Sequence, residues 1–206
     1  MVGTDLIMWK KRIRNTGSGA DQAAEIPAGL WKVESAASRL GFKVRHLIIS
    51  EVRGSFSEFE GTFTTIDGLI GSHVDATCKV ASVDTGDRIR DVWIRSRDFL
   101  DVDQWPQMRL SGDLTGEDSG DGVLETKMTI RDVTLPVRFT VTVEDLRLRG
   151  KEPEADRTRM SLLAAATVSR GDFGLKFGQI MEKGGYIVDD KVALRLHVSA
   201  ALQGDR

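Results

Sequence analysis

Residues 192–200 read VALRLHVSA, and nearly every second side chain from Val192 to Ala200 is large and apolar. A side-chain period of two is that of a β-strand with one buried face and one polar face. The same period runs through residues 40–44, 74–80, 108–114, 124–130, 137–143 and 160–168. The chain is therefore predicted to be all-β, with strands that each have one face to bury.

The spacing of these segments predicts how the strands are connected. Phe56, Phe59, Phe63 and Ile66 follow one another closely, and we interpret residues 54–66 as one long strand with a bulge. With this strand the chain has about eight, mostly joined by short turns, which favours antiparallel neighbours. Closing such a sheet into an antiparallel barrel buries the apolar face and removes the exposed edges.

One segment departs from the strand period. Residues 84–106 read DTGDRIRDVWIRSRDFLDVDQWP, and Ile89, Val92 and Trp93 have the i, i+3, i+4 spacing of one helical face. We predict a short helical insertion near residues 87–104. A charged insertion that carries aromatic residues between strands is a candidate lid over a cavity.

Composition narrows the function classes. The 206 residues carry 29 basic and 31 acidic side chains, a net charge of −2, so nucleic acid is not expected as a partner. The single cysteine, Cys78, has no partner for an internal disulfide, which fits a reducing compartment. The sequence has no apolar run of the roughly 18 residues that a membrane helix needs.

The N-terminal segment is expected to lie outside the folded domain. Residues 1–28 are predicted to be a flexible tail and linker, and residues 29–203 to be the β-barrel domain. The basic residues 10–14 follow a weakly apolar start, which is the reverse of a secretory signal, so a cytoplasmic protein is expected. Trp9 and these basic residues either make a weak membrane-surface contact or form a solvated tail.

The interior of the barrel has two interpretations. Ala76, Cys78, Ala164 and Ala166 fall at inward positions and leave space for a small ligand. Alternatively, Phe42, Phe139 and Trp93 fill that space, because barrels often alternate small and large side chains. No catalytic or zinc motif is found in the sequence, and the acidic residues 98–103 lack the glycine of a calcium loop, so no cofactor or metal is predicted.

Four segments resemble one family. They are LWKVESAASRLGFKVRHLIISEVRGSFSEFEGTF from residue 30, VASVDTGDRIRDVWIRSRDFLDVDQWP from residue 80, MTIRDVTLPVRFTVTV from residue 128 and SRGDFGL from residue 169. Their order and content resemble the YceI-like family over residues 30–202. In two places the chain departs from the family pattern, because Ala37 and Trp93 stand where the family often has histidine.

The resemblance implies a lipocalin-like antiparallel β-barrel whose apolar interior binds a polyisoprenoid or similar amphiphilic lipid. It implies no established catalytic activity, and it is compatible with a homodimer. An enzyme acting on a lipid-like substrate in the same barrel is the alternative, because the barrel could bring His46, His73 and His197 together.

The expected ligand contacts combine apolar residues for the tail with cationic residues for a head group. They are Phe42, Val44, Arg45, His46, Phe56, Phe63, Arg90, Trp93, Phe99, Phe139 and Phe173. Two of these have structural alternatives. His46 could instead cap a local turn, and Arg90 and Asp91 could form a salt bridge or a helix-terminal hydrogen bond that pins the insertion.

Overall fold

The structure is a computed structural model, and it describes residues 26–46, 50–66, 68–115, 121–150, 157–176 and 188–204. The predicted N-terminal tail, with Trp9 and its basic neighbours, lies outside the described residues except for positions 26–28. From Gly29 onward the chain is folded into strands, and the described part contains one α-helix.

The elements follow one another mostly as strands. Their bounds are β1 Gly29–Val33, the 3₁₀ turn η1 Ser35–Ala37, β2 Arg39–His46, β3 Ser50–Phe56, β4 Phe59–Thr65, β5 His73–Lys79, the 3₁₀ turn η2 Val80–Ser82, β6 Val83–Asp84, α1 Arg88–Arg95, β7 Gln107–Thr115, β8 Asp121–Ile130, β9 Val133–Arg147, β10 Arg159–Ser169 and β11 Val188–Leu202.

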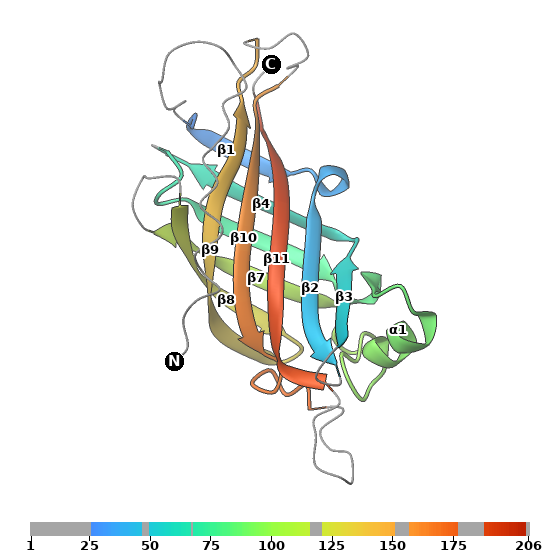
Figure 1. Ribbon diagram of the computed structural model, residues 1–206. Coiled ribbons are helices and arrows are strands. Elements are labelled where there is room, and N and C mark those ends of the chain that lie inside the picture. Colours follow the sequence, from blue (N-terminus) through green and yellow to red (C-terminus); the bar gives the residue numbers. More distant parts are fainter. Residues whose placement is uncertain are drawn as a thin grey trace.

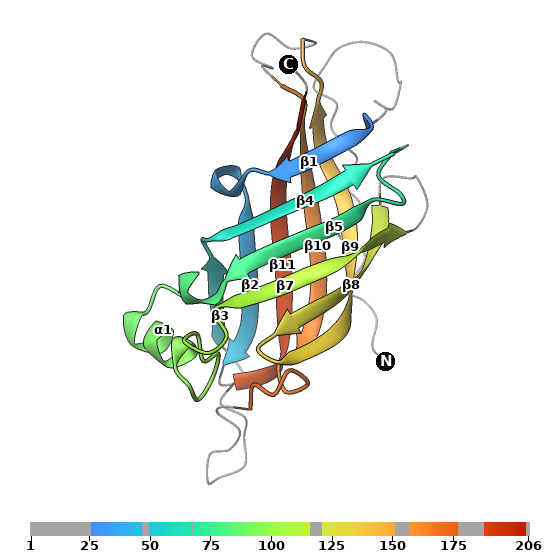
Figure 2. The same ribbon diagram turned by 180° about the vertical axis from the view of Figure 1, so that it is seen from behind.

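Eight of these strands close into a barrel. The order is β1, β4, β5, β7, β8, β9, β10 and β11, all neighbours are antiparallel, and β11 returns to β1. Figures 1 and 2 show β9, β10 and β11 on one side and β1, β4, β5 and β7 crossing them on the other. The prediction of a lipocalin-like antiparallel barrel of about eight strands is confirmed.

Strand β11 belongs to two pairings on the same edge. Its last residues pair with β1, with Trp31 opposite Leu202, and its first part pairs with β2. Strands β3 and β6 continue outward from β2. The barrel therefore carries a three-strand extension at one end, and α1 lies beside it (Figure 1).

The prediction of one long strand over residues 54–66 is wrong. The chain turns at Ser57 and Glu58, so that β3 pairs with β2 whereas β4 pairs with β1 and β5. The turn is held from outside, because the Ser57 amide donates to the Ser82 carbonyl at 3.3 Å and the Glu58 amide to the Ser82 hydroxyl at 3.1 Å. These bonds connect the β3–β4 corner to η2.

The seam between β1 and its neighbours is the most completely buried part of the core. Trp31 is fully buried and stacks on Phe63 with ring centroids 5.8 Å apart. Its indole N–H donates to the Thr65 hydroxyl oxygen at 3.0 Å, and that hydroxyl donates to the Pro27 carbonyl at 2.7 Å. Every polar atom of this buried aromatic corner thus has a partner.

The helical insertion is present, but its apolar face does not point inward. Helix α1 begins after Asp87, whose carboxylate accepts from the Ile89 and Arg90 amides, and turns continue from residue 96 to residue 104. Ile89 is 76%, Val92 65% and Trp93 50% exposed. The hypothesis that Trp93 fills or plugs the barrel is therefore wrong.

Replacing Thr65 with valine should leave the Trp31 indole N–H buried without an acceptor. We expect the free energy of unfolding to fall by about 2 kcal/mol, the usual cost of an unsatisfied buried donor. Chemical denaturation measures this loss, with Thr65→Ser expected to retain most of the stability. The neighbouring exposed Thr64 gives the matched control, since Thr64→Val removes no buried bond. An equal effect at both positions would show that the indole bond contributes nothing.

Candidate functional site

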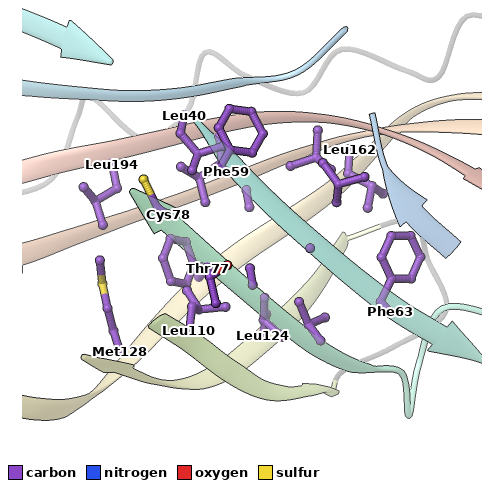
Figure 3. A pocket seen from close by; sticks show the side chains of 18 of the residues that line it. Leu40, Phe59, Phe63, Thr77, Cys78, Leu110, Leu124, Met128, Leu162 and Leu194 are labelled. Carbon is purple, nitrogen blue, oxygen red and sulfur yellow. The ribbon is translucent and has the colours of Figure 1, made fainter. Parts of the chain in front are cut away.

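The barrel encloses a cavity of about 180 Å³ between its two crossing sides. Apolar cavities of about 150 Å³ stay dry and can bind a benzene-sized molecule. Figure 3 places Phe63 at one end of the lining and Leu194 and Met128 toward the other. Lining positions come from strands β1, β2, β3, β4, β5, β7, β8, β9, β10 and β11. They include Leu40, Phe42, Phe56, Phe59, Phe63, Val74, Ala76, Cys78, Met108, Leu110, Leu124, Met128, Phe139, Val141, Leu162, Ala164, Leu194, Leu196 and Val198.

The chemistry of this lining is almost wholly hydrocarbon and sulfur. The side chains drawn in Figure 3 contribute one oxygen, at Thr77, beside the sulfur atoms of Cys78 and Met128. Burial raises the pKa of the Cys78 thiol to about 12, so the thiol stays neutral at physiological pH. The cavity can therefore hold an apolar group, and its described walls offer no charged side chain pointing at the centre that would bind an ion.

Four of the predicted ligand contacts line the cavity. They are Phe42, Phe56, Phe63 and Phe139. Phe42 also lies against Gly54, where an added Cβ would come within 2.3 Å of the ring, so Gly54 provides a close approach rather than the expected bulge. Ala76, Cys78 and Ala164, expected to leave space, also line the cavity.

The other predicted contacts lie away from the cavity lining. Val44 and Phe173 are buried, Phe99 packs against the edge of the core, and Arg45 and Trp93 are exposed. The side chain of His46 lies outside the described part of the structure. Sequence reasoning missed Phe59, Leu124, Met128 and Leu194, although each stands on an alternating strand and could have been found by extending the inward faces.

Arg90 and Asp91 hold the insertion in place. Asp91 is buried and accepts from the Thr85 amide at 3.0 Å and from the Thr85 hydroxyl at 2.6 Å. The Arg90 guanidinium donates to the same hydroxyl at 2.7 Å and to the Thr85 carbonyl at 2.9 Å. Both side chains therefore pin the insertion through Thr85. Arg90 lies 3.8 Å from the Asp87 carboxylate rather than pairing with Asp91, and it does not line the cavity.

The SRGDFGL motif forms the end of the barrel between β10 and β11. The buried Arg170 guanidinium donates to the carbonyls of Leu175, Val188 and Asp189 at 2.6, 3.0 and 3.0 Å. Phe173 is 2% exposed and belongs to the core. The motif thus closes this end through a buried cation and an aromatic residue, which explains why Phe173 does not reach the cavity.

A Ser–His–Asp arrangement lies on the outer surface of β5 and β7. His73 Nδ1 contacts Asp113, and its Nε2 lies 3.3 Å from the Ser111 hydroxyl and 3.4 Å from Asp75. Hydrogen bonding to Asp113 raises the pKa of His73, which favours the protonated form that cannot act as a base. The His73 imidazole is 53% exposed, and none of these four residues lines the cavity. We interpret the group as a surface charge network.

The comparisons with known proteins agree with this architecture. A family model described as the YceI-like domain matches residues 31–200. The chain belongs to the YceI-like family. A UPF0312 protein of Photorhabdus laumondii is 27% identical over 174 residues, covering 82% of this chain and 88% of that relative. One from Pseudomonas putida is 29% identical over 170 residues, covering 78% and 83%.

Solved structures with the same fold are more distant in sequence. BcnA of Burkholderia cenocepacia superposes with a TM-score of 0.68 at 20% identity, covering 81% of this chain and 98% of that one. A polyisoprenoid-binding domain from Saccharophagus degradans, implicated in plant cell wall breakdown, superposes with a TM-score of 0.63 at 14% identity, covering 84% and 98%. These likenesses show the YceI-like barrel fold. Within the described residues, no helix is both long and apolar enough to cross a bilayer.

The cavity thiol offers a direct test of the buried lining. With a pKa of about 12, only about one Cys78 thiol in ten thousand is ionised at pH 8, and the thiolate is the reactive form. We expect a disulfide reagent such as DTNB to label the native protein orders of magnitude more slowly than the protein unfolded in guanidinium. Rapid stoichiometric labelling of the native chain would contradict the burial of Cys78.

The His73 network predicts a measurable titration. The pKa of His73 is raised in the folded protein. The contact with Asp113 therefore stabilises the fold fully at pH values below the pKa of His73 in the unfolded chain. This stabilisation is lost as the pH rises through the pKa of His73 in the folded protein. NMR of the imidazole should show a pKa above 6.5. Asp113→Asn should lower that pKa more than Asp75→Asn does, since the Asp113 hydrogen bond is the largest cause; the reverse order would refute the assignment.

Proposed function

We propose that this YceI-like barrel binds a polyisoprenoid or a similar amphiphilic lipid through its apolar tail, as a carrier or store. The observation that supports the proposal is the hydrocarbon-lined cavity inside a closed barrel. The Saccharophagus degradans neighbour, whose name gives it polyisoprenoid binding, supports the same class of ligand. Of the predicted contacts, Phe42, Phe56, Phe63 and Phe139 are the ones retained for the tail.

The energetics suit such a ligand. Each methylene moved from water into the cavity is worth about 0.8 kcal/mol, so ten carbons offer about 8 kcal/mol before the costs of ordering and association are subtracted. A branched isoprenoid tail needs no charged partner along its length. The cavity is of the size that encloses a small group, so a long chain has to extend beyond it or widen it.

A head group would have to be recognised outside the cavity. The Arg90 guanidinium is engaged by Thr85, and Arg45 does not line the cavity, so the proposal assigns no head-group contact to either residue. Binding is assigned to the tail, and it is the tail that should determine selectivity.

Binding, not catalysis, is the function we infer for the barrel. The family and its polyisoprenoid-binding neighbour favour a binding protein. The cavity walls carry Cys78 as their titratable inward group, and its neutral thiol is a poor nucleophile. The cytoplasmic location and the homodimer remain predictions.

Filling the cavity should abolish uptake of the tail. Ala164 is buried and lines the cavity, whereas the next residue, Ala165, is exposed on the same strand. We expect Ala164→Leu to weaken binding of geranylgeraniol at least tenfold and Ala165→Leu to leave it unchanged, because three added carbons occupy the space of the ligand only at position 164. Fluorescence competition and native mass spectrometry measure this, with circular dichroism to confirm folding. If unmodified protein takes up no isoprenoid alcohol, the proposal is wrong.

A further inference from the structure

Helix α1 turns most of its apolar side chains to the outside, unlike an ordinary surface helix. Such a helix buries its apolar stripe against the core and turns its polar face to water. In α1 the side chains of Ile89, Val92 and Trp93 share the outer face and are at least half exposed. They are three of the five large exposed hydrophobic side chains in the described part of the chain.

The face of α1 that turns toward the barrel carries one apolar residue against the core, Ile94, and is otherwise held by polar contacts. Asp91, only 6% exposed, accepts two hydrogen bonds from Thr85. The Arg95 guanidinium donates to the carbonyls of Ala81 and Val83. These bonds fix the rotation of the helix, so its apolar face is directed outward by the fold and cannot turn inward without breaking them.

The size of the outer face decides between possible occupants. A specific contact between two proteins needs roughly 600 Å² or more from each partner, and three partly exposed side chains offer much less. A bilayer sets no such minimum, because each inserted side chain contributes by its own apolar area. Tryptophan is also enriched at the interface between lipid and water, where its amphipathic ring is favoured.

The surrounding charges indicate how such an insertion would be driven. Exposed Arg88 and Arg97 border the helix together with exposed Asp87 and Asp98. The two positive and the two negative side chains balance, so electrostatic attraction to an anionic membrane contributes little binding free energy. Contact at this face therefore has to come from the apolar side chains.

We propose that α1 docks this protein on the surface of a phospholipid bilayer by inserting Ile89, Val92 and Trp93. The choice of a bilayer as the occupant rests in part on the proposed function, since an isoprenoid lipid is taken from or delivered to a membrane. The docking surface is the outer face of α1, and it is distinct from the barrel interior.

A second exposed isoleucine, Ile66, provides a matched control for substitution of Ile89. Strand β4 ends at Thr65, on the side away from α1 (Figure 2), and Ile66 follows it directly. Ile66 is 78% exposed, nearly the same as the 76% of Ile89. Replacing either isoleucine with serine removes the same exposed side chain. Only Ile89→Ser removes it from the proposed docking face.

The test is partitioning of the full chain onto phosphatidylcholine vesicles, with and without phosphatidylglycerol. We expect Ile89→Ser to lower the partition coefficient about tenfold, Ile66→Ser to leave it unchanged, and the anionic lipid to change it little. Brominated phosphatidylcholine should quench the native protein, and Trp93→Phe should remove that quenching. Melting curves establish that the variants remain folded.

Several results would overturn the docking proposal. They are absence of vesicle binding, an equal loss from Ile66→Ser, binding that requires anionic lipid, and quenching that survives in Trp93→Phe. The last would assign insertion to another tryptophan. Isoprenoid uptake in detergent-free solution is measured separately, so a protein that takes up geranylgeraniol but ignores vesicles refutes the docking alone, and one that docks without uptake refutes the lipid-carrier function alone.

Discussion

Closure of the sheet between β11 and β1 is the constraint on which the rest of the molecule depends. Each strand has an apolar and a polar face, and the apolar faces share one interior only if the two ends of the sheet meet. The meeting point is short, with Trp31, Lys32 and Val33 opposite Leu202, Ala201 and Ala200. Burial of Trp31, its stacking on Phe63 and its bond to Thr65 concentrate stabilisation where the ladder has fewest backbone bonds. An opened seam would expose the apolar side of every strand.

The interior of the barrel has space, and small side chains from both of its crossing sides line that space. Ala76 and Cys78 on β5 lie across from the wall that contains Ala164 on β10, and the aromatic rings of Phe42, Phe56 and Phe139 surround the space without filling it. Removing polar atoms from the walls lets the space stay empty of water, since a water molecule needs two or more polar partners. The burial that keeps the Cys78 thiol neutral also makes the cavity suited to a hydrocarbon.

The alternation of apolar and polar residues was enough to predict the strands and their inward faces. It was not enough where a local structure is held by residues from a distant segment. Strands such as residues 137–143 and 192–200 show their inward faces directly, and the closed barrel follows from them. The break at Ser57 and Glu58 has no local signal, because Ser82 holds it. For α1 the residue spacing identified the apolar face, but it did not show whether that face points to the core or to solvent. Hydrogen bonds to Thr85 and to the carbonyls of Ala81 and Val83 decide this orientation. For the same reason the sequence does not reveal that Trp93 lies on the outer surface.

The segment after α1 connects the helix to the apolar core. The Leu100 amide donates to the Ile94 carbonyl at 3.0 Å and the Val102 amide to the Arg95 carbonyl at 3.2 Å, so the chain folds back against the last turn of the helix. Leu100 is 5% exposed, and both it and Val102 pack in or against the core cluster. Apolar side chains on the outside of α1 and apolar side chains under it are therefore parts of one hydrogen-bonded unit.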